Sequence, residues 1–314
     1  MRVLIGYEGS EHSGAAIDDL RRAGLPRDTS ALVATVSHVN NFEPPLSGEE
    51  ATVAVVESRV VKTLLARAYE DSLKARGDAH ALALEACDKV RSIFPEWEVR
   101  PLVLAGAPDR ELISEAERWD ADLILVCPHE RSALGRLFFG SVSKKVAAGA
   151  GCTVRVARPG FVRSSDTASR IVVGVDGSSG SERAVRAVGE RVWPHGTEAR
   201  LVAVDDGSSP VRLAGIIPST EPTVIACNEM AAVKTRMMLE WADKELRAVG
   251  LNVSIEIKEG VPLRTLIEEA HKWEADSIFV GSRGLGSGDE AAGLGQVAAG
   301  LVTDAHCSVE ISRQ

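Results

Sequence analysis

The residues that could do chemistry in this chain are glycines, hydroxyls and carboxylates that follow short aliphatic runs. Glu8-Gly9-Ser10 follows Val3-Leu4-Ile5, and Asp176-Gly177-Ser178 follows Ile171-Val172-Val173. Glycine lets the backbone turn tightly or approach another group closely. The free N–H groups where a turn opens a helix favour an anion such as a phosphate. These residues indicate a binding site more than a centre that breaks bonds.

Patterns of hydrolytic centres are missing from the sequence. The chain has no Gly-x-Ser-x-Gly, no His-Glu-x-x-His and no ordered Ser, His and Asp set. Gly135-x4-Gly140-Ser141 superficially resembles a P-loop, but it lacks the lysine that must reach the phosphates and does not directly follow a strand. We therefore expect a protein that is not an enzyme.

Composition narrows the range of partners. The formal charge is −9 with a pI near 5.4, and no run of five Lys or Arg occurs, so nucleic acid is an unfavourable partner. Gly6 and Glu8 interrupt the apolar start, and no stretch approaches 18 apolar residues, so we expect no signal peptide and no membrane association. The cysteines, which show no Cys-x-x-Cys spacing, are Cys87, Cys127, Cys152, Cys227 and Cys307. Their odd number and scatter favour a reducing, cytoplasmic location.

The strongest signal is an internal repeat. Arg2–Ser10 returns as Arg170–Ser178, 168 residues later, and Trp119-Asp120-Ala121-Asp122 returns as Trp273-Glu274-Ala275-Asp276, 154 residues later. The offset falls by 14, so the first copy holds about that many extra residues, which we place in Asn40 to Ser58. Two further patterns recur in the same order: Gly106-Ala107-Pro108 as Gly260-Val261-Pro262, and Cys152-Thr153-Val154 as Cys307-Ser308-Val309.

The repeat predicts two domains, residues 1–158 and 170–314, joined by a Pro-, Gly- and Ser-containing linker at 159–169. Within each copy, short aliphatic runs alternate with segments of helical period. In the second copy the predicted strands are 171–175, 200–204, 253–257, 277–280 and 308–311, and the predicted helices lie near 181–192, 230–249, 262–272 and 295–304. This alternation predicts an α/β fold with two tandem open parallel five-stranded sheets and helices on both faces.

In such a sheet, ligands bind at the carboxyl ends of the strands, where the strand order reverses. The loops after the first, second and fourth strands of each copy are therefore where a site is expected. Pro108 and Pro262 fit the first turn of a helix, where a missing N–H costs nothing.

At these residues the chain resembles the universal stress protein family in its tandem two-domain form. The resemblance covers nearly the whole chain in two passes, through the strand-ending Glu8-Gly9-Ser10 and Asp176-Gly177-Ser178, the Gly-x-Pro, the Ala-Asp and the Cys-x-Val patterns. It implies a Rossmann-like fold of the adenine nucleotide alpha hydrolase type and dimeric association. In some members it also implies ATP binding through Gly-x2-Gly-x9-Gly-Ser/Thr; other members lack that motif and bind no nucleotide.

Both copies depart from this motif. In the first, Gly140-Ser141-Val142-Ser143 matches the helix start, but Cys127 and Glu130 stand where the two glycines belong. A carboxylate a few Å from a phosphate would cost about 4 kcal/mol at an effective dielectric near 20. Arg131 and Arg136 could partly offset this repulsion.

In the second copy, Gly281-Ser282-Arg283-Gly284 keeps the glycine pair. The spacing to Gly295 is ten residues instead of nine, and Gln296 replaces the hydroxyl. The intervening loop has gained Asp289 and Glu290, where the family is usually basic. Each copy therefore keeps about half of a site.

The resemblance assigns nucleotide-binding positions in both copies. In the second copy they are Val175, Asp176, Gly177, Ser178, Val204, Gly281, Arg283, Gly284, Gly295, Gln296 and Val297. In the first copy, which has the weaker site, they are Glu8, Val39, Gly140, Ser141, Val142 and Ser143.

Several of these residues have a structural alternative. Asp176 and Glu8 match the acidic residue near the ribose or a metal, but either carboxylate could instead cap the turn into the first helix. His38-Val39 matches the adenine-side strand end, and a strand end in the core is the alternative, because a lone His has no metal-ligand partner at useful spacing. Cys127 could be a reactive thiol or a small buried hydrophobe.

The fifth strands suggest how the copies associate. The family's dimer pairs these edge strands, so in a tandem chain the two copies can pair with each other as an intrachain pseudo-dimer. Arg155 and Glu310 occupy equivalent positions. If exposed, their opposite charges would favour pairing of unlike copies by a few tenths to about 1 kcal/mol, and charge reversal at Glu310 that left association unchanged would count against this role.

Two functions stay open. The first is a regulatory stress-response protein with at most one adenine-nucleotide site, which lies in its second domain. The nucleotide would be ATP, with magnesium as its companion. The second is a partner-binding scaffold with degenerate pockets, which Glu130, Gln296 and Asp289-Glu290 favour. Slow ATP hydrolysis is a third reading that lacks an evident base. A homodimer through the Val-rich segment Thr52 to Val61 is a further association to test.

Overall fold

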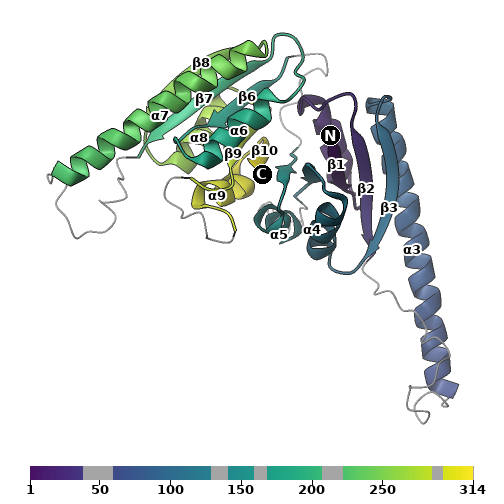
Figure 1. Ribbon diagram of the computed structural model, residues 1–314. Coiled ribbons are helices and arrows are strands. Elements are labelled where there is room, and N and C mark those ends of the chain that lie inside the picture. Colours follow the sequence, from purple (N-terminus) through teal and green to yellow (C-terminus); the bar gives the residue numbers. More distant parts are fainter. Residues whose placement is uncertain (38–58, 129–140, 159–167, 207–221, 285–292, 314) are drawn as a thin grey trace.

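Strands and helices alternate along the first copy as its sequence predicts. The computed structural model (Figure 1) describes residues 1–37, 59–128, 141–158, 168–206, 222–284 and 293–313. The strands of the first copy are β1 (Arg2–Gly6), β2 (Ser30–Ser37), β3 (Glu98–Ala105), β4 (Leu123–Val126) and β5 (Thr153–Val156). Its helices are α1 (Glu11–Asp19), the 3-10 turn η1 (Leu20–Arg22), α3 (Arg59–Ile93), α4 (Pro108–Trp119) and α5 (Ser141–Gly149).

The second copy repeats this order. Its strands are β6 (Arg170–Gly174), β7 (Glu198–Asp205), β8 (Asn252–Glu259), β9 (Ser277–Gly281) and β10 (Ser308–Ser312). Its helices are α6 (Ser179–Gly189), α7 (Pro222–Ala248), α8 (Pro262–Lys272) and α9 (Gln296–Asp304). Pro108 and Pro262 begin α4 and α8, as predicted. The helix predicted to start near residue 230 begins earlier, at Pro222.

The strands form one ten-stranded sheet, in the order β3-β2-β1-β4-β5-β10-β9-β6-β7-β8. The α/β class is confirmed, and the ten strands form one sheet instead of the two tandem five-stranded sheets predicted. Pairing within each copy is parallel, whereas β5 and β10 pair antiparallel, with Val156 opposite Val309 and Val154 opposite Ile311. Each copy by itself would leave an edge strand with unpaired N–H and C=O groups, and this pairing satisfies both edges at once.

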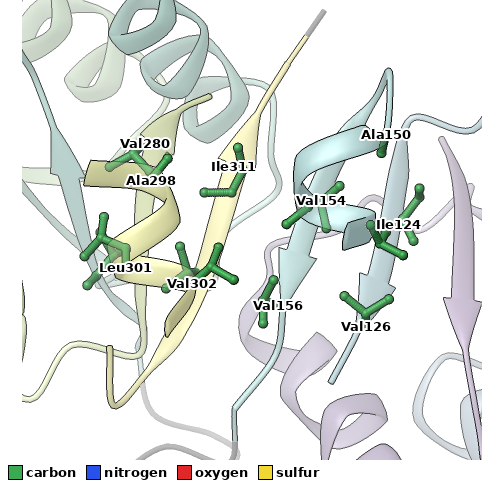
Figure 2. Packing of buried hydrophobic residues seen from close by; sticks show 14 of the residues in the cluster. Ile124, Val126, Ala150, Val154, Val156, Val280, Ala298, Leu301, Val302 and Ile311 are labelled. Carbon is green, nitrogen blue, oxygen red and sulfur yellow. The ribbon is translucent and has the colours of Figure 1, made fainter. Parts of the chain in front are cut away.

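One hydrophobic core runs across the junction of the copies. It joins Val154 and Val156 of β5 to Val309 and Ile311 of β10, and α4 and α5 to α8 and α9. Figure 2 shows α9 and β10 side chains on one side of this junction and β4 and β5 side chains on the other. The opposite face of the sheet has two separate cores, one under α1 and α3 and one under α6 and α7. Helices therefore cover both faces, as predicted.

Charged residues lie buried at the same junction. Arg155 pairs with Glu310 across the two strands, and the side chains of both residues are 0% exposed. Arg155 Nε also donates to Asp19 Oδ2 at 2.7 Å, and Arg191 pairs with Glu310. Burial opposes the charge of Arg155, but Asp19 and Glu310 outweigh burial and raise the pKa of the guanidinium above its ordinary value.

The sequence-based estimate for this pair applies only to exposed charges, and the structure does not meet that condition. Arg155 and Glu310 stand in the middle of a sheet covered on both faces by helices, so water does not screen them. Burial makes the arrangement sensitive to the loss of one partner, because the remaining charge would be left uncompensated in the interior.

Two long helices extend beyond the sheet at opposite ends of the molecule: α3 with 35 residues and α7 with 27. Helix α7 exposes Met230 and Met237, at 60% and 64%, and α3 exposes Leu73 at 50%. The 14-residue excess of the first copy, predicted in Asn40 to Ser58, and most of Thr52 to Val61 lie outside the described residues. Among the helices that are described, none is long and apolar enough to cross a membrane.

Replacing Glu310 by Ala is expected to lower the free energy of unfolding by about 3–5 kcal/mol, because Arg155 and Arg191 would lose their shared buried carboxylate. Urea denaturation followed by circular dichroism measures this loss. The matched control is Glu182→Ala, which removes an exposed pair with Arg186 and should leave the midpoint almost unchanged. Equal effects of the two substitutions would contradict the role given to the buried network.

Candidate functional site

The turn after β6 uses its polar side chains to start α6. Ser178 is the N-cap, and its Oγ accepts a hydrogen bond from the Ser181 N–H at 3.1 Å. Asp176 Oδ1 accepts from the Ser178 N–H at 3.0 Å. Gly177 has φ +80°, a left-handed conformation that favours glycine. The carboxylate therefore orders the turn, as the structural alternative for Asp176 proposed.

The glycine that ends β9 lies directly against the start of α6. A Cβ built on Gly281 would lie 2.3 Å from the Gly180 carbonyl carbon, and a Cβ built on Gly180 would lie 2.1 Å from the Arg283 oxygen. Real Cβ atoms do not approach backbone atoms so closely. Both positions therefore require glycine for the loop after β9 to rest on α6.

Gly284, the second glycine of the pair, lies against Asp176. A Cβ at this position would be 2.4 Å from Asp176 Oδ2. The loop after β9 thus folds over the turn after β6. Contacts within the chain by themselves account for both glycines. The role of Gly281 and Gly284 toward phosphate stays a prediction.

The loop after β9 also connects to the start of α9. The Gly295 N–H donates to the Ser282 oxygen at 2.8 Å, and Gly295 is the extended N-cap of the helix. No side chain among the described residues caps this helix through a hydrogen bond. Gln296, the first helical residue, is exposed, and Val297 is half-buried. The α9 N-terminus therefore presents backbone N–H groups beside the glycine pair.

The remaining second-copy positions frame this turn. Val175 is buried, and its N–H donates to the Val202 oxygen at 2.9 Å, which holds the end of β6 against β7. Val204 lies near the carboxyl end of β7, in register with Lys258. Arg283 Nε donates to the Gly293 oxygen at 3.5 Å, across the base of the loop. All of these positions lie toward the carboxyl ends of the strands, where a site was expected.

The first copy shows a similar turn. Glu8 Oε1 accepts from Ser10 Oγ at 3.0 Å, and Ser10 caps α1. At the start of α5, Ser141 is exposed, Val142 is half-buried and Ser143 is buried. Predicted residues that fall outside the described part of the chain are His38, Val39, Glu130, Arg131, Arg136, Gly140, Asp289 and Glu290.

The repeat explains why the two copies differ here. His12 is equivalent to Gly180, and Cys127 is equivalent to Gly281. Both glycines of the second-copy contact are thus replaced in the first copy. Gly180 was not predicted as a site residue. An alignment of the two copies could have found it, because Gly180 and Gly281 are both glycine in the second copy and both replaced in the first.

Cys127 lies at the end of β4, at the position equivalent to Gly281. Burial raises the pKa of its thiol to about 12, and the nearby Glu8 carboxylate adds to the rise. A raised pKa removes the thiolate that reacts, which favours the reading of Cys127 as a small hydrophobe, here half-buried against the core under α1 and α3. Among the described residues, no group of three or more His, Cys, Asp and Glu could hold a metal ion.

Comparison with known proteins identifies the family. The model of the universal stress protein family matches this chain twice, over residues 1–158 and 167–313. The chain belongs to the universal stress protein family. A universal stress protein of Methanocaldococcus jannaschii is 36% identical over 141 residues, covering 43% of this chain and 79% of that protein. One of Thermus aquaticus is 29% identical over 160 residues, covering 50% and 97%.

Solved structures confirm the tandem fold. A universal stress protein from Archaeoglobus fulgidus superposes with a TM-score of 0.60 at 18% identity, covering 99% of this chain and 98% of that one. A second, from Pseudomonas aeruginosa and titled a putative universal stress protein, superposes with a TM-score of 0.59 at 12% identity, covering 99% and 92%. At these identities the likeness establishes the fold alone.

Adding a methyl group at the glycine contact should destabilise the protein. Gly281→Ala and Gly180→Ala are each expected to cost about 1–3 kcal/mol of unfolding free energy, because each Cβ would displace backbone. Gly77→Ala in α3 is the control: a Cβ there meets none of the described atoms within 4 Å, so better helix propensity should raise stability by up to about 1 kcal/mol. Thermal denaturation measures all three, and a neutral Gly281→Ala would refute the contact.

The Cys127 thiol should resist alkylation in the folded protein. With a pKa of about 12, about one thiol in ten thousand is ionised at pH 8. Iodoacetamide labelling at pH 8, followed by peptide mass spectrometry, should show Cys127 reacting far more slowly in buffer than in urea. Rapid labelling without urea would contradict the assignment of Cys127 as a half-buried, inactive thiol.

Proposed function

We propose that this universal stress protein is a regulatory stress-response protein, located in the cytoplasm, with one adenine-nucleotide site in its second copy. The observation that supports a site in the second copy is that the glycine pair, the Asp176 turn and the N-terminus of α9 meet at one edge of the sheet. Backbone N–H groups at a helix start suit phosphate oxygens. The second copy is therefore the better candidate for ATP with magnesium.

The residues present fit the phosphate end of a nucleotide through the backbone. The first N–H groups of α9 have no side-chain cap within the described part of the chain, so they are suited to an anion. A bound nucleotide would supply a phosphate anion for these groups, and Arg283, at the base of the loop, would add positive charge. Asp176, whose Oδ1 accepts from the Ser178 N–H, would hold the turn in place beneath the ligand.

The first copy is proposed to bind no nucleotide. His12 and Cys127 replace the two glycines whose backbones touch in the second copy, and a Cβ at either glycine would clash with backbone there. Glu130 adds a negative charge to this loop. We expect no ATP hydrolysis at either copy, because neither turn offers an evident base.

A second candidate function is a partner-binding scaffold without nucleotide. Two observations favour it: the glycine pair is explained by contacts within the protein, and the projecting helices expose Leu73, Met230 and Met237. In both readings we propose that the two copies act as an intrachain pair through β5 and β10, and that any homodimer forms through other surfaces. Neither reading involves nucleic acid or a membrane.

Nucleotide binding can be tested by a charge placed at the start of α9. The purified protein is denatured to look for released nucleotide, and the refolded or apo protein is titrated with Mg-ATP by calorimetry. Gln296→Glu should weaken binding at least tenfold by repelling phosphate, yet leave stability equal or higher, because a carboxylate at a helix N-terminus is favourable. Gln296→Ser, which restores the family's hydroxyl, should tighten binding.

The first copy provides the matched control. Ser141 begins α5 at the position equivalent to Gln296, so Ser141→Glu places the same charge at the same helix position in the other copy. This variant should bind Mg-ATP like the wild type. Absence of both released nucleotide and binding heat in the wild type would overturn the nucleotide site and leave the scaffold function.

A further inference from the structure

Some contacts between the two copies obey an approximate twofold symmetry. Arg158 Nη2 donates to the Val302 and Thr303 oxygens at the end of α9, at 2.5 and 3.1 Å. Arg313 Nη2 donates to the Ala147 and Ala148 oxygens at the end of α5, at 2.5 and 3.1 Å. The two arginines are equivalent in the repeat, as are their acceptors, at an offset of 155. A guanidinium suits the negative end of a helix, so each copy stabilises a helix of the other.

Other contacts break this symmetry. We define the seam as β5 and β10 together with residues 19–25 and 187–193, the segments at the ends of α1 and α6. Many equivalent seam positions hold residues of different size or charge, among them five pairs: Asp19 and Ala187, Ala23 and Arg191, Gly24 and Val192, Leu25 and Trp193, and Arg155 and Glu310. The offset of 168 for the helix ends is supported by Thr29 and Thr197, which make identical 2.7 Å bonds to Pro26 and Pro194.

The charges alternate across the seam. Asp19 lies beside Arg155, Arg155 beside Glu310, and Glu310 beside Arg191, so negative and positive groups follow one another. Pairing two first copies would place Arg155 opposite a second Arg155, and pairing two second copies would place Glu310 opposite a second Glu310. Like charges at a buried centre are strongly unfavourable because no water screens them.

Two hydrogen bonds across the seam are made by charged side chains that only one of the copies has. Arg191 of the second copy donates through Nη1 to the Ala23 oxygen of the first at 2.6 Å. Asp19 of the first copy accepts from Ser308 Oγ of the second at 2.9 Å. The equivalents of these charged side chains, Ala23 and Ala187, cannot make such bonds.

Steric fit gives the same preference. A Cβ at Gly24 would lie 2.7 Å from the Trp193 ring, so the ring packs where only glycine leaves room. The Val192 N–H donates to the Gly24 oxygen at 2.8 Å beside this contact. In a pairing of two second copies, Trp193 would meet Val192 and clash, whereas in a pairing of two first copies, Leu25 would meet Gly24 and leave a gap.

We propose that the seam is a heterospecific interface: the edge of each copy is complementary to the edge of the other copy and is not complementary to itself. The partner that fits β5 and its flanking helix end is therefore the second copy of a chain, and β10 is matched only by a first copy. The seam does not recruit a like copy from another molecule, nor a relative whose edge is self-complementary. This inference is independent of nucleotide binding.

The test exchanges the five seam positions in the full chain. In the homotypic variant, the second copy takes the residues of the first: Ala187→Asp, Arg191→Ala, Val192→Gly, Trp193→Leu and Glu310→Arg. In the exchanged variant, these five changes are combined with Asp19→Ala, Ala23→Arg, Gly24→Val, Leu25→Trp and Arg155→Glu. The exchanged chain carries twice as many substitutions but restores complementarity with the copies reversed.

The proposal predicts that the homotypic variant loses the seam. Urea denaturation should show two separate transitions or a midpoint clearly below that of the wild type. The exchanged variant should recover most of the lost midpoint and remain the same size as the wild type in light scattering. A homotypic variant that unfolds like the wild type, or an exchanged variant no more stable than the homotypic one, would overturn the proposal.

Discussion

The pairing of β5 with β10 is the constraint on which the rest of this structure depends. A five-stranded copy that ended at its fifth strand would leave that edge unpaired, and the antiparallel ladder satisfies both edges in one step. The same pairing merges one face of the two copies into a single hydrophobic core. It also forces Arg155 and Glu310 into the interior, where each is compensated by the other and by Asp19 and Arg191.

The antiparallel pairing of β5 with β10 separates the expected ligand-binding ends of the two copies. Because β5 and β10 run in opposite directions, the carboxyl ends of the first copy's strands and those of the second point to opposite sides of the sheet. Each copy therefore has its own turn, and the two turns differ in sequence. The second retains glycine at residues 180 and 281, where backbones touch, while the first has His12 and Cys127.

The glycine pair of the second copy has a packing role in addition to the role that the family motif gives it. Glycine in the motif is explained by close approach of backbone to phosphate, but in this chain Gly281 and Gly284 approach Gly180 and Asp176. The two explanations are compatible, because a loop held on the α6 turn also holds the start of α9 through the bond of Gly295 to Ser282. Packing of the loop would then prepare the backbone for a ligand.

The sequence by itself determined the duplication, the element order and the turn chemistry, because these depend on local patterns that recur within each copy. Pro108 and the alternating aliphatic runs act over a few residues, so their roles were predicted, whereas Ser178 was predicted only as a nucleotide-binding position and is the N-cap of α6. The tertiary structure decided that ten strands form one sheet, that Arg155 and Glu310 are buried, and that Gly281 meets Gly180. Those facts depend on which distant segments come together, which neither spacing nor composition specifies, and the local pattern at Gly180 carries no sign of its neighbour 101 residues away.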